Sequence, residues 1–101
     1  MSKLTDAIRG MDCMIRLPGC LFDPETVVGC HYRLAGFSGI GLKSPDYLIA
    51  AGCAHCHSVV DGREFIHNHS RDMVRLALAE AVFRTQAKLF ELGLLIVKGK
   101  P

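Results

Sequence analysis

Tryptophan is absent from this 101-residue chain, and the large aromatic residues together make up only 7% of it. Long hydrophobic runs are missing as well, so we expect no segment that crosses a bilayer. The first residues lack the apolar stretch of a secretory signal, which favours a cytoplasmic location. The formal net charge of +2 is too small to indicate nucleic-acid binding by itself, although its sign is compatible with such a partner.

Cysteine, in contrast, is abundant, because the chain contains five. The length, the apolar half of the composition and the lack of repeats or linkers predict a single domain over residues 1–101. A domain this small buries a modest core, so a bound metal ion would add useful stability. Disulfides are rare in a reducing compartment, and clustered cysteines there favour metal binding or catalysis.

The strongest motif is the pair Cys53 and Cys56. A spacing of two residues lets both sulfurs face one zinc ion from a tight loop. This pair supplies half of a tetrahedral site, and we expect Cys13 and Cys20 to supply the other half. Six residues separate that second pair, which is wider than usual, but Pro18-Gly19 predicts a turn that brings the two sulfurs together.

Other interpretations of these residues remain open. The four thiols can be reduced and buried, since free cysteine packs as a small apolar side chain, and we expect this of Cys30. His55 is a rival zinc ligand, and His57 can complete the site in place of Cys20. A redox protein that uses Cys53 and Cys56 is a third possibility, but the upstream cysteine pair and the lack of a βαβ pattern favour metal.

Propensity and capping signals predict a mixed α and β protein. The predicted elements are a helix over 3–9 with Ser2 as N-cap, an extended segment or strand over 12–17, a strand over 26–34, a glycine-rich connection over 36–45, a helix from near Cys53 to Val60, an extended stretch over 63–67, a helix over 71–91 capped by Ser70, and an edge strand over 94–97. In the long helix the apolar stripe is predicted to contain Met73, Leu76, Ala77, Ala81, Val82, Leu89 and Phe90.

The order of strand, glycine-containing loop and helix, with His31 on the strand and His57 on the helix, resembles the ββα-metal (His-Me finger) core of HNH endonucleases. This resemblance covers residues 13–61, about half of the chain. The whole chain more closely resembles the small nucleases of lambdoid prophages, through the 13–20 arm, the 31–34 element and the 53–57 segment. The resemblance implies an α+β fold with a zinc-stapled ββα-metal core and a long C-terminal helix.

The resemblance also implies roles for individual side chains. His31 matches the general base that takes a proton from the attacking water. His57 matches the helix ligand of a catalytic divalent ion, taken to be Mg²⁺, and Asp61 lies four residues on as a second ligand. Asp46 stands nearest the position of the family's asparagine and is a further candidate ligand. Three cations near this site are candidates for contacts to nucleic-acid phosphates: Arg33, Lys43 and Arg63.

We therefore predict a metal-dependent endonuclease that hydrolyses DNA phosphodiester bonds and carries a structural zinc. The rival is a non-catalytic zinc-binding module of phage origin that binds nucleic acid or protein. Two departures from the HNH pattern favour the rival: Cys30 precedes His31 where many relatives have an acid or histidine, and Asp46 replaces the asparagine. Asp46 and Asp61 are also ordinary turn residues, and each cation alone fits a solvated surface.

Overall fold

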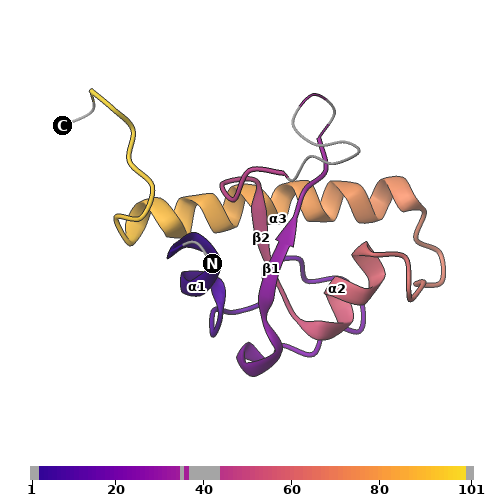
Figure 1. Cartoon of the computed structure of the whole chain (residues 1–101). Coiled ribbons are helices and arrows are strands. Elements are labelled where there is room, and N and C mark those ends of the chain that lie inside the picture. The colour runs from indigo at the N-terminus through magenta and orange to yellow at the C-terminus, as the bar shows by residue number, and fades with distance from the viewer. Residues whose placement is uncertain (1–2, 35, 37–43, 100–101) are drawn as a thin grey trace.

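The structure, a computed structural model, describes residues 3–34, 36 and 44–99 and has the α+β class that the sequence predicts. A two-stranded sheet lies at its centre, and the long C-terminal helix runs behind it (Figure 1). The elements in chain order are α1 (Lys3–Ile8), the 3-10 turn η1 (Pro24–Thr26), β1 (Val28–His31), β2 (Ile49–Gly52), α2 (Ala54–Val60) and α3 (Arg71–Glu91). None of the described helices is both long and apolar enough to span a membrane.

The sheet pairs β1 with β2 in antiparallel register, with Cys30 opposite Ala50 and His31 opposite Ile49. Strand β2 is buried along its whole length, so it shows no alternation of polar and apolar residues. The elements predicted from the sequence therefore include no strand here. β1 is shorter than the predicted strand over 26–34, because η1 forms at its start and the pairing ends at His31.

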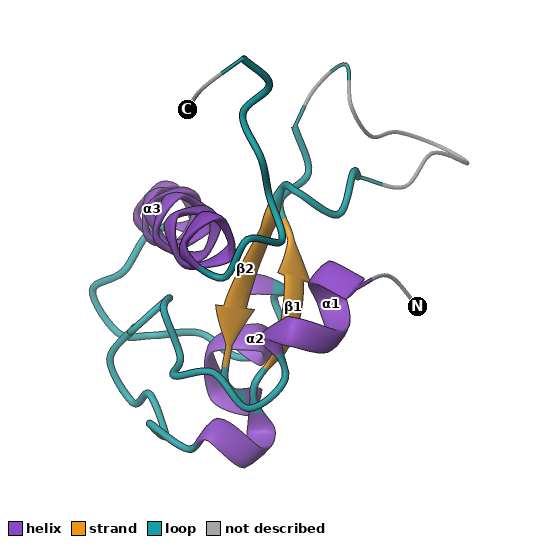
Figure 2. Ribbon diagram, turned by 90° about the vertical axis from the view of Figure 1, so that its left-hand side faces the viewer, coloured by secondary structure: helices purple, strands orange, loops and turns teal. Residues whose placement is uncertain are grey.

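Helix α3 packs on the outer edge of β2, as the end-on view in Figure 2 shows. The buried hydroxyl of Thr85 accepts a hydrogen bond from the Ala51 amide at 3.0 Å and donates one to the Ala81 carbonyl at 2.7 Å. The Ala51 carbonyl accepts from the Met14 amide at 2.8 Å. Both backbone groups of Ala51 on the unpaired side of the sheet are thereby satisfied, which makes a two-stranded sheet tolerable in a buried position.

Helix α3 has the predicted bounds. The predicted cap is also confirmed, because the Ser70 side chain accepts a hydrogen bond from the Met73 amide at 3.1 Å. Its predicted apolar stripe was partly wrong, since Met73, Leu76 and Phe90 are exposed. The core face is instead built from Val74, Leu78, Ala81, Val82, Thr85 and Leu89. Apolar residues occur on two sides of this helix, so periodicity alone could not select the side that faces the sheet.

Two predicted strands are absent from the described residues. Residues 94–97 have no regular secondary structure, and the Leu94 amide donates to the Leu89 carbonyl at 2.9 Å. Residues 12–17 are an irregular extended arm, the other form that the sequence allowed. The predicted cap at Ser2 and most of the glycine-rich connection lie outside the described residues.

Candidate functional site

The four predicted cysteine ligands come together from two segments of the chain. Their sulfur atoms all lie within 4.8 Å of one another in the group Cys13, Cys20, Cys53 and Cys56. The sulfurs of Cys20 and Cys53 are 3.7 Å apart. A tetrahedral zinc ion with Zn–S bonds of about 2.3 Å requires sulfurs roughly 3.8 Å from one another. All four are free thiols, so the cluster is placed to hold one metal ion such as zinc.

Local backbone geometry explains why the upstream arm reaches α2. Gly19 has a φ of +87°, and a Cβ there would come within 2.7 Å of the His55 ring. The same ring contacts the Pro18 carbonyl with its Nε2 at 2.9 Å. Glycine thus permits the close approach of the two segments that places Cys20 beside Cys53. His55, a rival zinc ligand in the sequence, instead joins the arm to the helix.

The thiols of the cluster perturb one another. The pKa of Cys13 is lowered to about 4, mainly by a hydrogen bond with the Cys56 thiol and further by backbone amides, Cys53 among them, against the opposing effect of burial. The pKa of Cys56 is raised, first by the hydrogen bond with Cys13 and then by burial. Burial is the main cause that raises the pKa of Cys20 to about 11. A lowered pKa at Cys13 favours its thiolate, the form that binds a metal ion.

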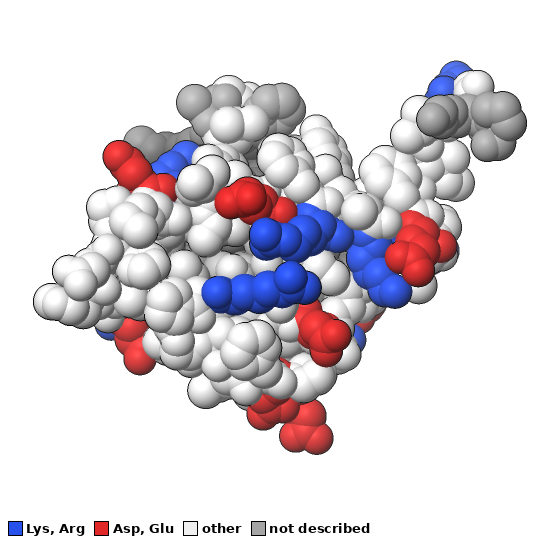
Figure 3. Space-filling view, turned by 180° about the vertical axis from the view of Figure 1, so that it is seen from behind, with Lys and Arg blue, Asp and Glu red and all other residues white. Residues whose placement is uncertain are grey.

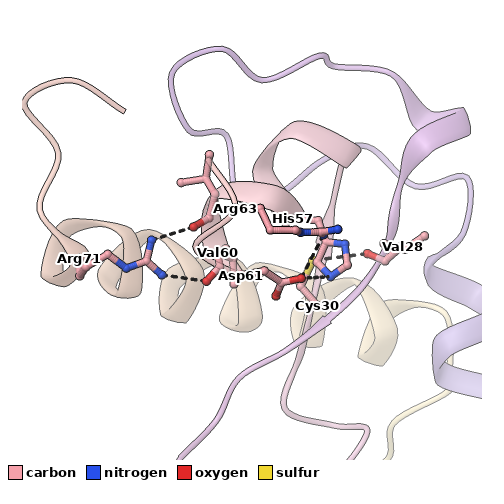
Figure 4. Close-up of polar contacts among 8 residues, drawn as sticks. Val28, Cys30, His57, Val60, Asp61, Arg63 and Arg71 are labelled. Carbon is pink, nitrogen blue, oxygen red and sulfur yellow. Dashed lines mark hydrogen bonds and ion pairs between the residues drawn. The ribbon is translucent and has the colours of Figure 1, made fainter. Parts of the chain in front are cut away.

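The fifth cysteine, Cys30, lies on β1 away from this cluster and is buried. Its sulfur is 3.9 Å from the Val28 carbonyl (Figure 4). Burial is the main cause that raises the pKa of Cys30 to about 12. This agrees with the predicted buried thiol, which packs as a small apolar side chain.

His31 lies at the end of β1 with its side chain exposed, and its Nε2 is 2.9 Å from Asp46 Oδ1. Two hydrogen bonds at Tyr32 hold the Asp46 turn beside the strand. The Tyr32 amide donates to the Leu48 carbonyl and the Ser44 hydroxyl donates to the Tyr32 carbonyl, both at 2.8 Å. The sequence marked Asp46 as a metal ligand, but the structure places its carboxylate against the imidazole.

The second predicted pair lies at the end of α2, where His57 Nε2 is 3.2 Å from Asp61 Oδ2 (Figure 4). The predicted spacing of four residues on one helix face is thus present. Arg63 binds the same carboxylate oxygen at 3.1 Å. Asp61 is also the C-cap of α2, and Gly62 follows with a φ of +80°, so the turn expected from this residue pair coexists with the contact to His57.

His31 and Asp61 line one cleft of about 560 Å³ between the sheet, the end of α2 and the start of α3. The cleft is basic, because three arginines line it: Arg33, Arg71 and Arg75. Its apolar wall consists of Val60, Val74 and Leu78. Among the predicted cations, Arg33 therefore lines the cleft, Arg63 contacts Asp61 without lining the cleft, and Lys43 lies outside the described residues.

Two arginines from α3 line the cleft, although they are not among the three cations that the sequence assigned to the site. The Arg71 guanidinium donates to the Val59 and Val60 carbonyls at 2.8 Å each, so it caps the end of α2 (Figure 4). Arg75 donates to the Tyr32 hydroxyl at 2.9 Å and lies 4.9 Å above the Tyr32 ring. Their spacing of four residues on one helix face was the available signal, but the sequence does not show that this face meets β1.

Comparison with known proteins relates the chain to one family. The sequence profile of the family described as "Putative nuclease YbcO" matches residues 2–94. The chain is 38% identical over 87 residues to "Putative nuclease YbcO" of Escherichia coli (strain K12), and the match covers 85% of this chain and 88% of that protein. A protein of Enterobacteria phage 82 with the same description matches to the same extent.

A solved structure gives the same relationship. It is described as a putative bacteriophage protein from Escherichia coli str. K-12 substr. MG1655 and has a TM-score of 0.72 and 31% sequence identity to this chain. The match covers 88% of this chain and 98% of that one, so the likeness includes nearly the whole fold. By its family match and by its identity to these relatives, the chain belongs to the YbcO family, whose named members are described as putative nucleases.

Proposed function

We propose that this protein is a metal-dependent HNH-type endonuclease, a hydrolase that cuts DNA phosphodiester bonds within a single domain over residues 1–101. The observation that carries the proposal is the basic cleft in which the imidazole of His31 and the carboxylate of Asp61 meet three arginines. The order β1, β2, α2 supports a ββα-metal core. The nuclease descriptions of the relatives agree with this chemistry.

His31 is the general base in this proposal. Asp46 Oδ1 accepts the hydrogen of Nε2 across 2.9 Å, which leaves Nδ1 with a lone pair. That nitrogen takes the proton from the water that attacks phosphorus. Asp46 acts as a positioning residue, since it accepts a hydrogen bond as the side-chain oxygen of an asparagine would. The replacement of the family's asparagine by aspartate is therefore compatible with activity.

His57 and Asp61 hold the catalytic divalent ion. Their donor atoms lie 3.2 Å apart, and one imidazole nitrogen with one carboxylate oxygen leaves most coordination positions open for water and phosphate. Such a donor pair fits Mn²⁺, Ni²⁺ or Zn²⁺ at least as well as Mg²⁺, the ion expected from the resemblance. When bound, the ion supplies positive charge that stabilises the transition state and the leaving oxygen.

The arginines of the cleft bind the phosphates of the substrate. Arg33, which follows β1, and Arg75, from α3, both line the cleft, and Arg63 and Lys43 are the remaining cations assigned to the same backbone. Arg75 is held in place by Tyr32, so little conformational entropy is lost when it contacts a phosphate. This placement favours a DNA strand that runs between β1 and α3.

A structural zinc on the four cysteines holds the active site together in this proposal. Cys56 and His57 are consecutive residues of α2, so an ion that fixes the first also limits the movement of the second. The zinc-loaded protein is accordingly the form to be tested, and a cytoplasmic location would keep the thiols reduced.

The test is nicking of supercoiled plasmid by the zinc-loaded protein with Mg²⁺, Mn²⁺ or Ni²⁺. We expect nicking that depends on the added ion and is lost in His31→Ala. His67→Ala is the matched control, because His67 is exposed and lies outside the cleft. Equal nicking by wild type and His31→Ala would assign the activity to a contaminant or to another base.

The second candidate function is a zinc-binding module that binds nucleic acid or protein without cleavage. Cys30 favours it, because a buried thiol stands where many HNH enzymes have a metal ligand before the base. In that case no divalent ion would support nicking. DNA affinity would be unchanged in His31→Ala and reduced in Arg75→Ala.

A further inference from the structure

Helix α3 lies on one side of the sheet in Figure 2, and large apolar residues of this helix outside the core face keep much of their side-chain surface exposed. Met73, Leu76, Phe83 and Phe90 are 46%, 62%, 67% and 43% exposed. Figure 3 looks onto the molecule from the side on which α3 lies, where a central band of charged side chains is surrounded by uncharged surface. Because the opposite side of the same helix forms the core, α3 is apolar on two faces, a pattern typical of a helix that packs against two neighbours.

These side chains follow the spacing of a helix–helix seam. With Glu80 and Ala87 included, consecutive members are separated by three, four, three, four and three residues. This alternation keeps all six on one side of the helix over about 26 Å. We call these six residues the α3 seam: Met73, Leu76, Glu80, Phe83, Ala87 and Phe90.

The α3 seam has the same spacing in both directions along the chain, which makes it self-complementary. An antiparallel second copy would place Met73 opposite Phe90, Leu76 opposite Ala87, and Glu80 opposite Phe83. Each contact then occurs twice about a two-fold axis between residues 81 and 82, as an isologous interface requires. In the pairs Met73–Phe90 and Leu76–Ala87, an apolar side chain faces an apolar partner.

Charge also supports this pairing. Glu80 is the only acidic member of the α3 seam, and Arg84 lies one turn along the helix, with its guanidinium 4.0 Å from the Glu80 carboxylate. In the antiparallel arrangement both residues lie beside the two-fold axis. Glu80 of each copy is therefore close to Arg84 of the other, which balances the charges at the centre of the contact.

We propose that the protein forms an antiparallel homodimer through the α3 seam. The cleft remains open in this dimer, because Arg71, Arg75 and the apolar residues of α3 that line it belong to a different side of the helix. The dimer therefore stands independently of the proposed nuclease activity.

The first test is sedimentation equilibrium of the zinc-loaded full chain. We expect twice the 11.1 kDa mass of one chain at micromolar concentrations. Phe83→Glu, which introduces charge at the centre of the seam, should raise the dimer Kd by about a hundredfold or more. Phe65→Glu is the matched control, since Phe65 is 79% exposed but lies outside α3, and it should leave the dimer intact. Unchanged thermal unfolding of both variants in the monomer range verifies that they are folded.

A charge-pair experiment tests the direction of pairing. Met73→Glu and Phe90→Lys should each raise the dimer Kd about tenfold or more, whereas the double variant should recover most of that loss, because Glu then faces Lys twice. Parallel pairing would set like charges against each other and weaken the double variant further. A wild-type chain that is monomeric at about 100 µM would overturn the proposal, and so would a dimer that persists in Phe83→Glu. In either case the α3 seam would be the binding surface for a different protein.

Discussion

The cysteine cluster and the basic cleft lined by His31 and Asp61 both include residues at the ends of the short helix α2, but they differ in burial. The cluster lies at its first turn, where Cys53 and Cys56 are fully buried. The cleft lies at its last turn, beside side chains such as His31 and Asp46 that are 38% and 40% exposed. Buried thiols around one ion can contribute to folding, whereas exposed pairs contribute little stability and stay accessible to substrate. Stability and chemistry should therefore be separable by mutation.

The largest expected effect is the loss of the cluster. Cys56→Ser should remove the bound metal ion and destabilise the fold by several kcal/mol, because ion binding contributes about 10 kcal/mol or more in small zinc domains. Thermal unfolding and zinc content measure the effect. Cys30→Ala is the control, as it removes a buried thiol outside the cluster and should retain one zinc per chain. An unchanged melting temperature in Cys56→Ser would show that the cysteine cluster does not stabilise the fold.

A second prediction concerns the other end of the same helix. His57→Ala should lower nicking by about 100-fold or more, because it removes a proposed ligand of the catalytic ion. The free energy of unfolding should change by less than about 1 kcal/mol, since the pair with Asp61 is half exposed. Zinc content should remain that of wild type. A variant that loses its zinc as well would instead place His57 in the structural site.

The third prediction concerns the contact that fixes the sheet to α3. Thr85→Val should destabilise the protein by about 1–3 kcal/mol, because it leaves the buried Ala51 amide without a partner. Denaturant unfolding measures this change. The nicking rate per folded molecule should stay the same, since Thr85 does not line the cleft. A large loss of activity with normal stability would link this contact to the chemistry.

The smallest effect is expected at the edge of the cleft. Arg75→Gln should weaken DNA binding severalfold and reduce the slope of log Kd against log salt concentration by about one, as expected when one phosphate contact is lost. Lys88→Gln is the matched control, because Lys88 lies on the same helix but neither lines the cleft nor belongs to the α3 seam. Equal effects of both variants would indicate a diffuse attraction to DNA without a specific contact.

The cysteine motif shows which parts of the site can be predicted from short sequence segments. Spacing of two residues predicted the pair on α2, and the Pro18-Gly19 turn correctly indicated that the upstream pair would join it. Capping by Ser70 predicted the start of α3 because it depends on residues three positions apart. The pairing of His31 with Asp46 was not predicted, since it depends on how the chain returns from the connection between β1 and β2.

By itself, the sequence determined the α+β class, the helices α2 and α3 and the likeness to a nuclease family, because these follow from periodicity, caps and motifs within short segments. Only the tertiary structure decided which side of α3 meets β2 and which side stays exposed. Both sides are apolar, so the choice depends on the shape of the sheet and on Thr85 bonding to Ala51. That single choice places Arg71 and Arg75 in the cleft and leaves the α3 seam facing outward.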